Sequence, residues 1–340
     1  MSGEQPKQFF EDFTGASSSK FELLPQSGSA RKNYLASTTS KQYIVTENQH
    51  LAENESFLYF SEIFEQLGLN TPKIFTVSND RSQYVQEFLG KQTLSEVIAN
   101  EGLNSVTKSL VKQTLEKLYQ LQVRTQGKID YSKTFEYESY DRFPITNDLF
   151  YFKSFIVDVL EIAYHKSRLL KEFERITQFL EKLNPRGLMI RDFQARNILV
   201  DEDNRCYFID YQSAMEGPLM YDVVSFLYQA KANFPEEFRQ EMLEYYYSLW
   251  NDDQIIAELK NSLEPLKFIR FSQVLGAYGF RGLIQRKGHF LASLQLGIEN
   301  LKNFSLAWEE MKNYPELFKI IHALASPPIN LKIKQLTSLS

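Results

Sequence analysis

The chain has 340 residues, of which 43% are hydrophobic and 24% charged, so it can bury a large core and is long enough for two lobes. Its formal net charge of -5 argues against a dedicated nucleic-acid-binding protein and favours a small-molecule substrate. A single cysteine, Cys206, excludes a disulfide framework and makes the cytoplasm the expected compartment. We find neither the apolar core of a signal peptide nor a run near the ~20 residues of a membrane span, so we expect no membrane association.

The N-terminal part has the pattern of a small sheet with one helix. Strand-like runs at 21–24 and 32–37 flank the small-residue turn 25–30, which predicts a hairpin. Further strands are expected over 41–46, 73–77 and 83–87. Between them, one apolar face predicts a helix that runs from Glu53 to a stop at Gly68; it is formed by Phe57, Leu58, Phe60, Ile63, Phe64 and Leu67.

Beyond Gly90 the composition changes to long helical segments. Helices are expected over 93–100, 105–122, 149–165 and 169–183, and again through most of 234–325. The aromatic and acidic loop 129–147 could fold against an active-site mouth or simply pack, and we favour packing. Strands followed by helices predict an α+β chain with a small antiparallel sheet and a large, mainly helical part. We divide it into residues 1–89 and 90–340.

The stretch from Gly187 to Asp210 carries the chemistry. Asp192 and Asn197 stand between two apolar runs, and Asp210 ends a third run that follows a turn, so a β-hairpin would bring all three side chains to one end. Phosphoryl transfer needs such a set, with a carboxylate to accept the proton of the attacking hydroxyl and an Asn and an Asp to hold Mg²⁺. The alternative is that Asp192 and Asp210 only cap turns.

This spacing resembles the kinase-like phosphotransferases, the superfamily of aminoglycoside phosphotransferases, choline kinases and protein kinases. The phrase from Arg191 to Asn197 looks most like the bacterial kinases that phosphorylate N-acetylmuramate and N-acetylglucosamine. The resemblance implies a two-lobed protein-kinase-like fold, ATP and Mg²⁺ as cofactors, Asp192 as the base, and Asn197 and Asp210 as metal ligands. It extends over roughly residues 15 to 300, with strong motifs only between 187 and 223.

Two residues of the family pattern are missing. Ile190 stands where relatives carry a His that braces the catalytic loop, and the strand 41–46 has no Lys where relatives bind phosphate. Arg31 or Lys32 could supply the missing charge, and the alternative is that both are solvated hairpin residues. The anomeric sugar kinases also carry basic residues after this turn, which favours Arg31.

The resemblance also assigns residues around the nucleotide. The hairpin tip at Ser27, Gly28 and Ser29 would approach the phosphates through backbone N–H groups, although an ordinary surface turn would look the same. The backbone from Glu87 to Leu89 would bind the adenine edge.

Helix-borne acids complete the set that the resemblance implies. Glu53 or Glu55 would pair with Arg31 or only favour the start of their helix. Asp222 would brace the catalytic loop by accepting backbone N–H groups, or act only as a helix N-terminal acid.

The acceptor is expected to bind in the C-terminal helical part. Residues 268–290 contain four cationic side chains and no Asp or Glu, which favours a neutral or anionic acceptor. The resemblance makes Arg281 and Arg286 candidates for substrate or phosphate binding, with helix packing as the alternative. We therefore predict an ATP- and Mg²⁺-dependent kinase of a small-molecule hydroxyl, most readily an amino sugar such as N-acetylmuramate or N-acetylglucosamine. The alternatives are an aminoglycoside or choline-like kinase, or a non-catalytic nucleotide-binding regulatory protein.

Overall fold

A computed structural model describes residues 4–25, 30–229 and 232–338 of the chain. Residue contacts divide it into two compact units, the first of residues 1–138 and 188–215 and the second of residues 139–187 and 216–340. The units follow packing, so the first one includes helices that lie beyond residue 90. The predicted division into residues 1–89 and 90–340 stays a prediction.

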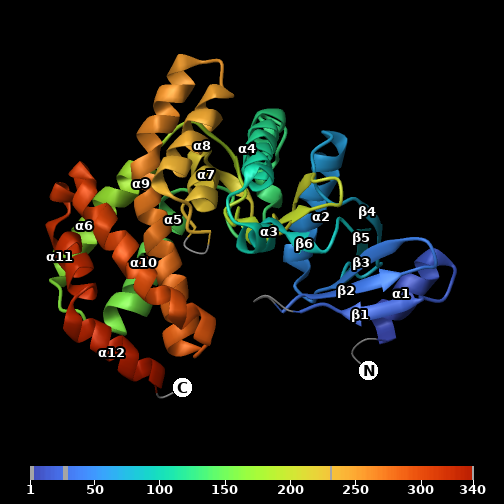
Figure 1. The fold of residues 1–340 in the computed structure, drawn as a ribbon, viewed down its shortest axis with the longest axis horizontal. Coiled ribbons are helices and arrows are strands. Elements are labelled where there is room, and N and C mark those ends of the chain that lie inside the picture. Colours follow the sequence, from blue (N-terminus) through green and yellow to red (C-terminus); the bar gives the residue numbers. More distant parts are fainter. Residues whose placement is uncertain (1–3, 26–29, 230–231, 339–340) are drawn as a thin grey trace. The chain divides into compact units, whose positions relative to one another are not determined.

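The first unit contains a five-stranded antiparallel sheet in the order β1-β2-β3-β5-β4 (Figure 1). Its strands are β1 (Lys20–Leu23), β2 (Lys32–Ser37), β3 (Gln42–Glu47), β4 (Ile74–Val77) and β5 (Gln83–Glu87). All five predicted strands are present, each within one residue of its expected bounds. The predicted hairpin is the β1–β2 pair, in which Leu23 lies opposite Tyr34.

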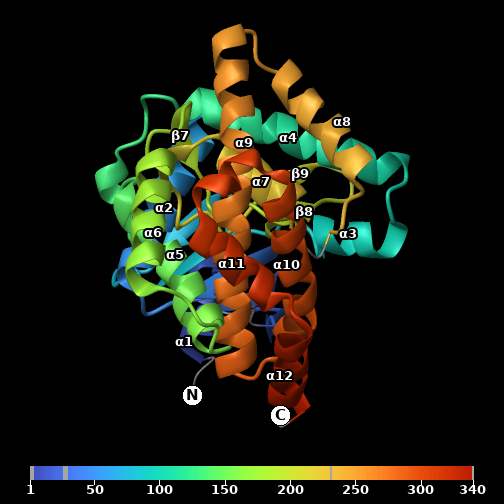
Figure 2. The same cartoon turned by 90° about the vertical axis from the view of Figure 1, so that its left-hand side faces the viewer.

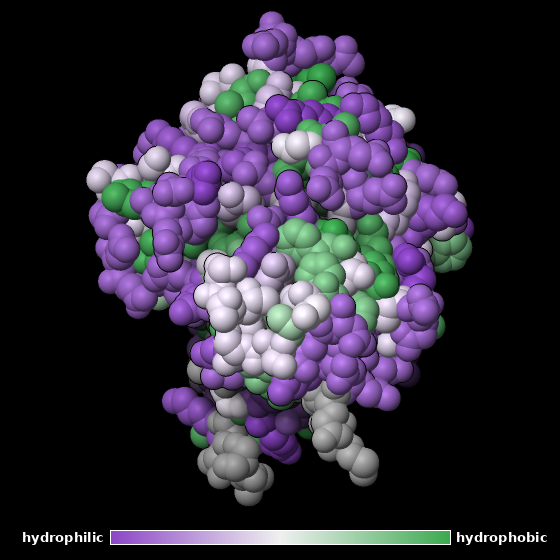
Figure 3. All heavy atoms as spheres, turned by 90° about the vertical axis from the view of Figure 1, so that its right-hand side faces the viewer, coloured by the Kyte–Doolittle hydropathy of each residue, from purple (hydrophilic) through white to green (hydrophobic). Residues whose placement is uncertain are grey.

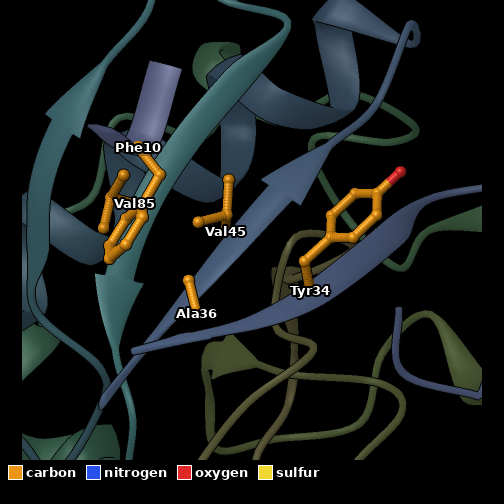
Figure 4. Close-up of a cluster of buried hydrophobic side chains, with 5 residues drawn as sticks. All are labelled: Phe10, Tyr34, Ala36, Val45 and Val85. Atoms are coloured by element: carbon orange, nitrogen blue, oxygen red, sulfur yellow. The ribbon is translucent and has the colours of Figure 1, made fainter. Parts of the chain in front are cut away.

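Each face of this sheet is covered by a helix. Helix α1 (Glu4–Thr14), which we did not predict, buries Phe10 fully on one face; the ring belongs to an apolar cluster with Tyr34, Ala36, Val45 and Val85 (Figure 4). Side chains alternate along a strand, and Tyr84, next to Val85, stacks on Phe57 of α2 (Leu51–Gln66) at 5.2 Å between ring centroids. Helix α2 therefore covers the opposite face.

Figure 3 views the molecule from the side that carries α1 and this sheet, and polar side chains cover most of what it shows. Apolar side chains gather mainly near the centre of the view. Several aromatic side chains of the sheet are covered by helix α1: Tyr43 lies edge-on to Phe10 at 5.5 Å and to Phe13 at 5.9 Å. The aromatic residues of α1 thus extend the core of the first unit beyond the sheet.

The rest of the first unit holds the predicted catalytic stretch. Its helices are α3 (Leu94–Glu101), α4 (Ser105–Thr125), η1 (Tyr131–Lys133) and η3 (Ala195–Asn197). A three-stranded sheet has the order β6-β8-β9, with β6 (Gln92–Thr93), β8 (Ile198–Val200) and β9 (Cys206–Phe208). Leu199 of β8 lies opposite Tyr207 of β9. The β-hairpin predicted before Asp210 is therefore confirmed.

The second unit is mainly helical (Figure 2). Its helices are α5 (Arg142–Phe152), η2 (Lys153–Asp158), α6 (Lys166–Leu180), α7 (Met220–Leu227), α8 (Glu236–Ser248), α9 (Asp253–Tyr278), η4 (Gly279–Ile284), α10 (Gly288–Ala307), η5 (Glu309–Asn313), α11 (Pro315–Leu324) and α12 (Pro327–Ser338). The strands β7 (Arg186–Met189) and β10 (Met215–Pro218) pair with each other. In the described part of the chain, no helix is both long and apolar enough to cross a membrane.

Helix α9 is the central helix of this unit and contacts α5, α7 and α10. A Cβ on Gly276 would lie 2.9 Å from the backbone nitrogen of Phe152, so only glycine lets α9 and α5 approach so closely. The helix expected over 149–165 begins earlier, at Arg142, because Asp141 caps it by accepting the N–H of Phe143 at 2.9 Å.

Candidate active site

The three residues predicted from the hairpin lie together in the first unit. Asn197 is central, because its Nδ2 donates to the backbone oxygen of Asp192 at 2.9 Å and to Oδ2 of Asp210 at 3.3 Å. The backbone oxygen of Asn197 accepts the N–H of Ile209 at 3.1 Å, which fixes the chain just before Asp210. The amide of Asn197 thus closes the loop that begins at Asp192 and joins it to the end of the hairpin.

Asp210 is held by donors on both carboxylate oxygens. Besides Asn197, it accepts from Arg31 Nη2 at 2.8 Å and from Gln212 Nε2 at 3.0 Å, both at Oδ1. Its backbone has φ of +64°, a left-handed conformation that is uncommon for residues other than glycine. Such conformations concentrate at functional sites, because the surrounding structure must hold them in place.

Arg31, directly before β2, also reaches helix α2. Its Nη2 lies 3.2 Å from Oε1 of Glu53, and both side chains are largely buried. Burial lowers the pKa of Arg31, but neighbouring Tyr84, Asp210 and Glu53 outweigh burial and hold the pKa above its ordinary value. The guanidinium therefore stays charged between two carboxylates.

The competing candidates for these contacts have other partners. Lys32 Nζ lies 3.3 Å from Glu47, and Glu55 pairs with Arg81. Thus Arg31 and Glu53, rather than Lys32 and Glu55, form the ion pair beside Asp210.

Strand β3 shows why the cation comes from elsewhere. Val45 belongs to the cluster under α1, so Thr46 is on the face toward α2, opposite Tyr84. Thr46 is fully buried; its hydroxyl donates to Asn33 Oδ1 at 2.8 Å and accepts from Gln86 Nε2 at 3.0 Å. Thr46 lies opposite Tyr84, and Tyr84 is a neighbour of Arg31, so the cation beside this part of the sheet comes from the residue before β2.

The predicted adenine-binding segment follows β5. The N–H of Glu87 donates to the backbone oxygen of Lys73 at 2.9 Å, so that donor is already used within the sheet. Leu89 is buried. Gly90 has φ of +111°, and a Cβ there would lie 2.9 Å from the backbone oxygen of Val200, at the end of β8.

The roles expected for the other predicted residues stay predictions. Ser27, Gly28 and Ser29 lie outside the described residues. Asp222 belongs to the second unit, where it is fully buried in the first turn of α7.

The two arginines predicted for the acceptor also belong to the second unit. Arg281 in η4 lies over the ring of Phe290 at 5.3 Å. Arg286 has φ of +58° and donates to the backbone oxygen of Leu336, which ties it to α12.

The donor set around Asp210 is suited to Mg²⁺. The described residues contain no cluster of three or more His, Cys, Asp or Glu side chains able to hold a metal. Mg²⁺ in kinases needs no such cluster, because one or two carboxylates, waters and substrate phosphates usually complete its shell. The carboxylate of Asp210 has more lone-pair sites than the three hydrogen bonds use, and it is 34% exposed. Asp210 and Asn197 therefore fit a metal that binds together with a nucleotide.

Two further residues, Gln212 and Tyr84, belong to this cluster and were not predicted from the sequence. Gln212 donates to Asp210, and its own Oε1 lies 3.4 Å from Arg31 Nη1. Its backbone oxygen accepts the hydroxyl of Ser56 on α2 at 2.7 Å. Tyr84 adjoins Arg31 from β5. A polar residue two positions after Asp210 was a visible signal, whereas Tyr84 became recognisable only with the strand register.

Comparison with known proteins decides the family. Residues 22–259 match the phosphotransferase enzyme family. The chain belongs to this family. A curated relative, the N-acetylmuramate/N-acetylglucosamine kinase of Neisseria meningitidis serogroup B, is 24% identical over 196 residues, which cover 56% of this chain and 55% of the relative. The chain thus matches about half the length of that relative.

Similarity to solved structures confirms the expected fold. The choline kinase LicA from Streptococcus pneumoniae superposes with a TM-score of 0.62 at 17% identity, covering 88% of this chain and 99% of the neighbour. A thermostable mutant of the aminoglycoside phosphotransferase APH(4)-Ia gives a TM-score of 0.57 at 14% identity, covering 86% and 98%. This phosphotransferase thus has the predicted two-lobed, protein-kinase-like α+β fold.

Proposed function

We propose that this phosphotransferase is an ATP- and Mg²⁺-dependent kinase that phosphorylates a hydroxyl group of a small molecule in the cytoplasm. The observation that carries the proposal is the single cluster of Asp192, Asn197 and Asp210, joined to the buried Arg31–Glu53 pair. If Asp192 and Asp210 only capped turns, nothing would require the buried guanidinium of Arg31 between the carboxylates of Asp210 and Glu53. A nucleotide phosphate, in contrast, needs both a cation and a metal-binding carboxylate.

Each residue has a role that its contacts support. Asp192 would accept the proton of the attacking hydroxyl, and Asn197 holds its backbone in place. Asp210 and Asn197 would hold Mg²⁺, which neutralises charge on the phosphates when bound. Arg31 would bind phosphate oxygens through its fork of N–H donors, as the missing strand Lys does in relatives. The backbone of Ser27, Gly28 and Ser29, and that of Glu87 to Leu89, remain our candidates for phosphate and adenine contact.

For the acceptor we propose an amino sugar such as N-acetylmuramate or N-acetylglucosamine. The sugar kinase of Neisseria meningitidis supports this choice, as does the absence of Asp and Glu from residues 268–290. Arg281 is the stronger substrate candidate of the two arginines, because Arg286 already donates to Leu336. Asp222 is proposed to brace the catalytic loop.

The test is turnover of a panel of acceptors. Purified protein is incubated with Mg-ATP and N-acetyl sugars, aminoglycosides or choline-like alcohols, while ADP release is followed and the product is identified by phosphorus NMR. The matched control is Asp192→Asn with the same panel. Turnover of aminoglycosides or choline with none on N-acetyl sugars would contradict the sugar proposal. Binding of Mg-ATP without turnover of any acceptor would favour a regulatory nucleotide-binding protein, the second candidate.

A further inference from the structure

Arg191, directly before the proposed base, has an unusual backbone. Its φ is +71°, and the N–H of Asp192 donates to the backbone oxygen of Ile190 at 2.9 Å, which closes a tight turn around Arg191. Three-residue turns with a positive φ at the centre are rare and strained for side chains larger than glycine. A residue that keeps a long side chain at such a position points to a use for that side chain.

The side chain of Arg191 is held by the segment 130–137 of the same unit. Nη1 lies 3.9 Å from Oε2 of Glu136, an ion pair without a hydrogen bond between the two atoms, and the guanidinium carbon lies 5.9 Å from the ring centroid of Tyr137. The side chain of Arg191 is only 12% exposed. Ion pairing and a cation–π contact therefore act on a largely desolvated guanidinium, where both are stronger than at a fully exposed site.

The same segment is attached to helix α2 at two points. The N–H of Asp130 donates to the hydroxyl oxygen of Tyr59 at 2.6 Å, and the ring of Phe135 meets the ring of His50 edge-on at 5.6 Å. His50 is the N-cap of α2, because its Nδ1 accepts the N–H of Glu53 at 3.2 Å. The segment 130–137 thus connects the turn before Asp192 to the first turn of the helix that carries Glu53.

We propose that Arg191 is a positioning residue that holds Asp192 through the segment 130–137. Ile190 is buried and apolar, so its side chain cannot brace the loop by hydrogen bonds. Arg191 supplies the brace from the next position by anchoring the turn to Glu136 and Tyr137. Because the segment also contacts α2, the brace fixes the base relative to Glu53 and hence to Arg31. The role of the brace in catalysis rests on the proposed kinase function, whereas the brace itself does not.

The first test measures hydrogen–deuterium exchange of peptides covering residues 190–197, without nucleotide or acceptor. Arg191→Ala and Glu136→Gln should each raise exchange there by roughly threefold or more, because the turn opens more often when its anchor is lost. Glu138→Gln is the matched control, since Glu138 is also exposed, lies two residues away and makes no ion pair among the described residues. Unchanged exchange in both test variants, or an equal rise in Glu138→Gln, would overturn the brace.

The second test separates the side chain from the backbone. Arg191→Gly suits the positive φ but removes the guanidinium, whereas Arg191→Lys keeps a cation near Glu136 and Tyr137. We expect turnover to fall by about tenfold in Arg191→Gly, with partial recovery in Arg191→Lys and with KM for Mg-ATP within about twofold of wild type. Wild-type turnover in Arg191→Gly would mean that only the turn matters. If the wild-type protein itself shows no turnover, the proposed function is contradicted. The exchange of residues 190–197 would then still show whether Arg191 holds the turn.

Discussion

Arg31 Nη2 lies 2.8 Å from Oδ1 of Asp210 and 3.2 Å from Oε1 of Glu53, so one guanidinium joins the end of a hairpin to the first turn of α2. This geometry places a cation beside the proposed metal ligand even though β3 has no Lys. A nucleotide phosphate arriving with its metal would compete with Asp210 for the same guanidinium. We therefore expect replacement of Arg31 to weaken nucleotide binding.

Replacing Arg31 by Ala should weaken Mg-ATP binding or catalysis by about 1.5 to 3 kcal/mol, the range for hydrogen bonds to charged groups. Lys32→Ala is the matched control, since Lys32 pairs with Glu47 instead. Calorimetry with Mg-ATP and steady-state kinetics measure both effects. Equal and negligible losses in the two variants would mean that metal and backbone alone neutralise the phosphates.

Replacing Asp192 by Asn should lower turnover by ~10²-fold or more, because the amide cannot accept the hydroxyl proton. Affinity for Mg-ATP should stay close to that of the wild type, since Asp192 is proposed to contact the acceptor rather than the metal. Rapid-quench measurement of product formation, together with calorimetry, separates the two quantities. Unchanged turnover would remove Asp192 from the mechanism.

Replacing Asp210 by Asn should abolish Mg²⁺-dependent nucleotide binding, because the metal loses its main protein carboxylate. Asp203→Asn, in the exposed turn between β8 and β9, is the control and should bind Mg-ATP normally. Calorimetric titration with and without Mg²⁺ gives the result. Wild-type Mg-ATP affinity in Asp210→Asn would show that the metal assignment is wrong.

Cys206 should react slowly with thiol reagents in the folded protein. Burial raises the pKa of its thiol to about 11, whereas an unfolded thiol titrates near ~8.5. Since the folded-state pKa is the higher one, the stability linked to this thiol is present below about pH 8.5 and is lost as pH rises toward 11.

Two measurements check this prediction. At pH 8 a disulfide reagent should label the single cysteine quickly in denaturant and slowly without it. The free energy of unfolding should fall less steeply between pH 9 and 10.5 in Cys206→Ala than in the wild type. Fast labelling of the native protein would contradict the burial of Cys206.

Glu172 should stabilise the second unit. Its carboxylate accepts the N–H groups of Glu316 at 2.9 Å and Leu317 at 2.8 Å. A residue of α6 thus satisfies buried N–H donors in the first turn of α11, which have no acceptor within their own helix. Glu172→Ala should lower the free energy of unfolding by about 1 to 3 kcal/mol, because two buried donors lose their acceptor. Chemical denaturation compared with Glu174→Ala, an exposed position on the same helix, checks the value.

Local sequence patterns predicted the strands and the candidate trio. Asp192, Asn197 and Asp210 are close in sequence, and a single hairpin is enough to bring them together. The choice between Arg31 and Lys32 needed the three-dimensional structure. Side chains of adjacent residues in an extended chain point to opposite faces, and the strand register decides which of the two lies beside Asp210. The same holds for Glu53 and Glu55, since two positions along a helix turn a side chain by more than half a circle.

Other features left weaker signals. Helix α1 could have been found, because Phe9, Phe10 and Phe13 recur at helical spacing. The turn at Arg191 could not be predicted, because a positive φ at a non-glycine residue leaves no mark in the sequence. The sequence pattern places 190 to 192 in one loop, and only the coordinates reveal the turn within it.

The backbone contact at Gly90 has a consequence for protein engineering. Since a Cβ there would lie 2.9 Å from the backbone oxygen of Val200, no side chain fits unless the main chain moves. Saturation mutagenesis should therefore return many functional choices at the partly exposed Glu87 and almost only glycine at position 90. Variants that test the proposed adenine contact should therefore change Glu87 or Phe88 and keep Gly90.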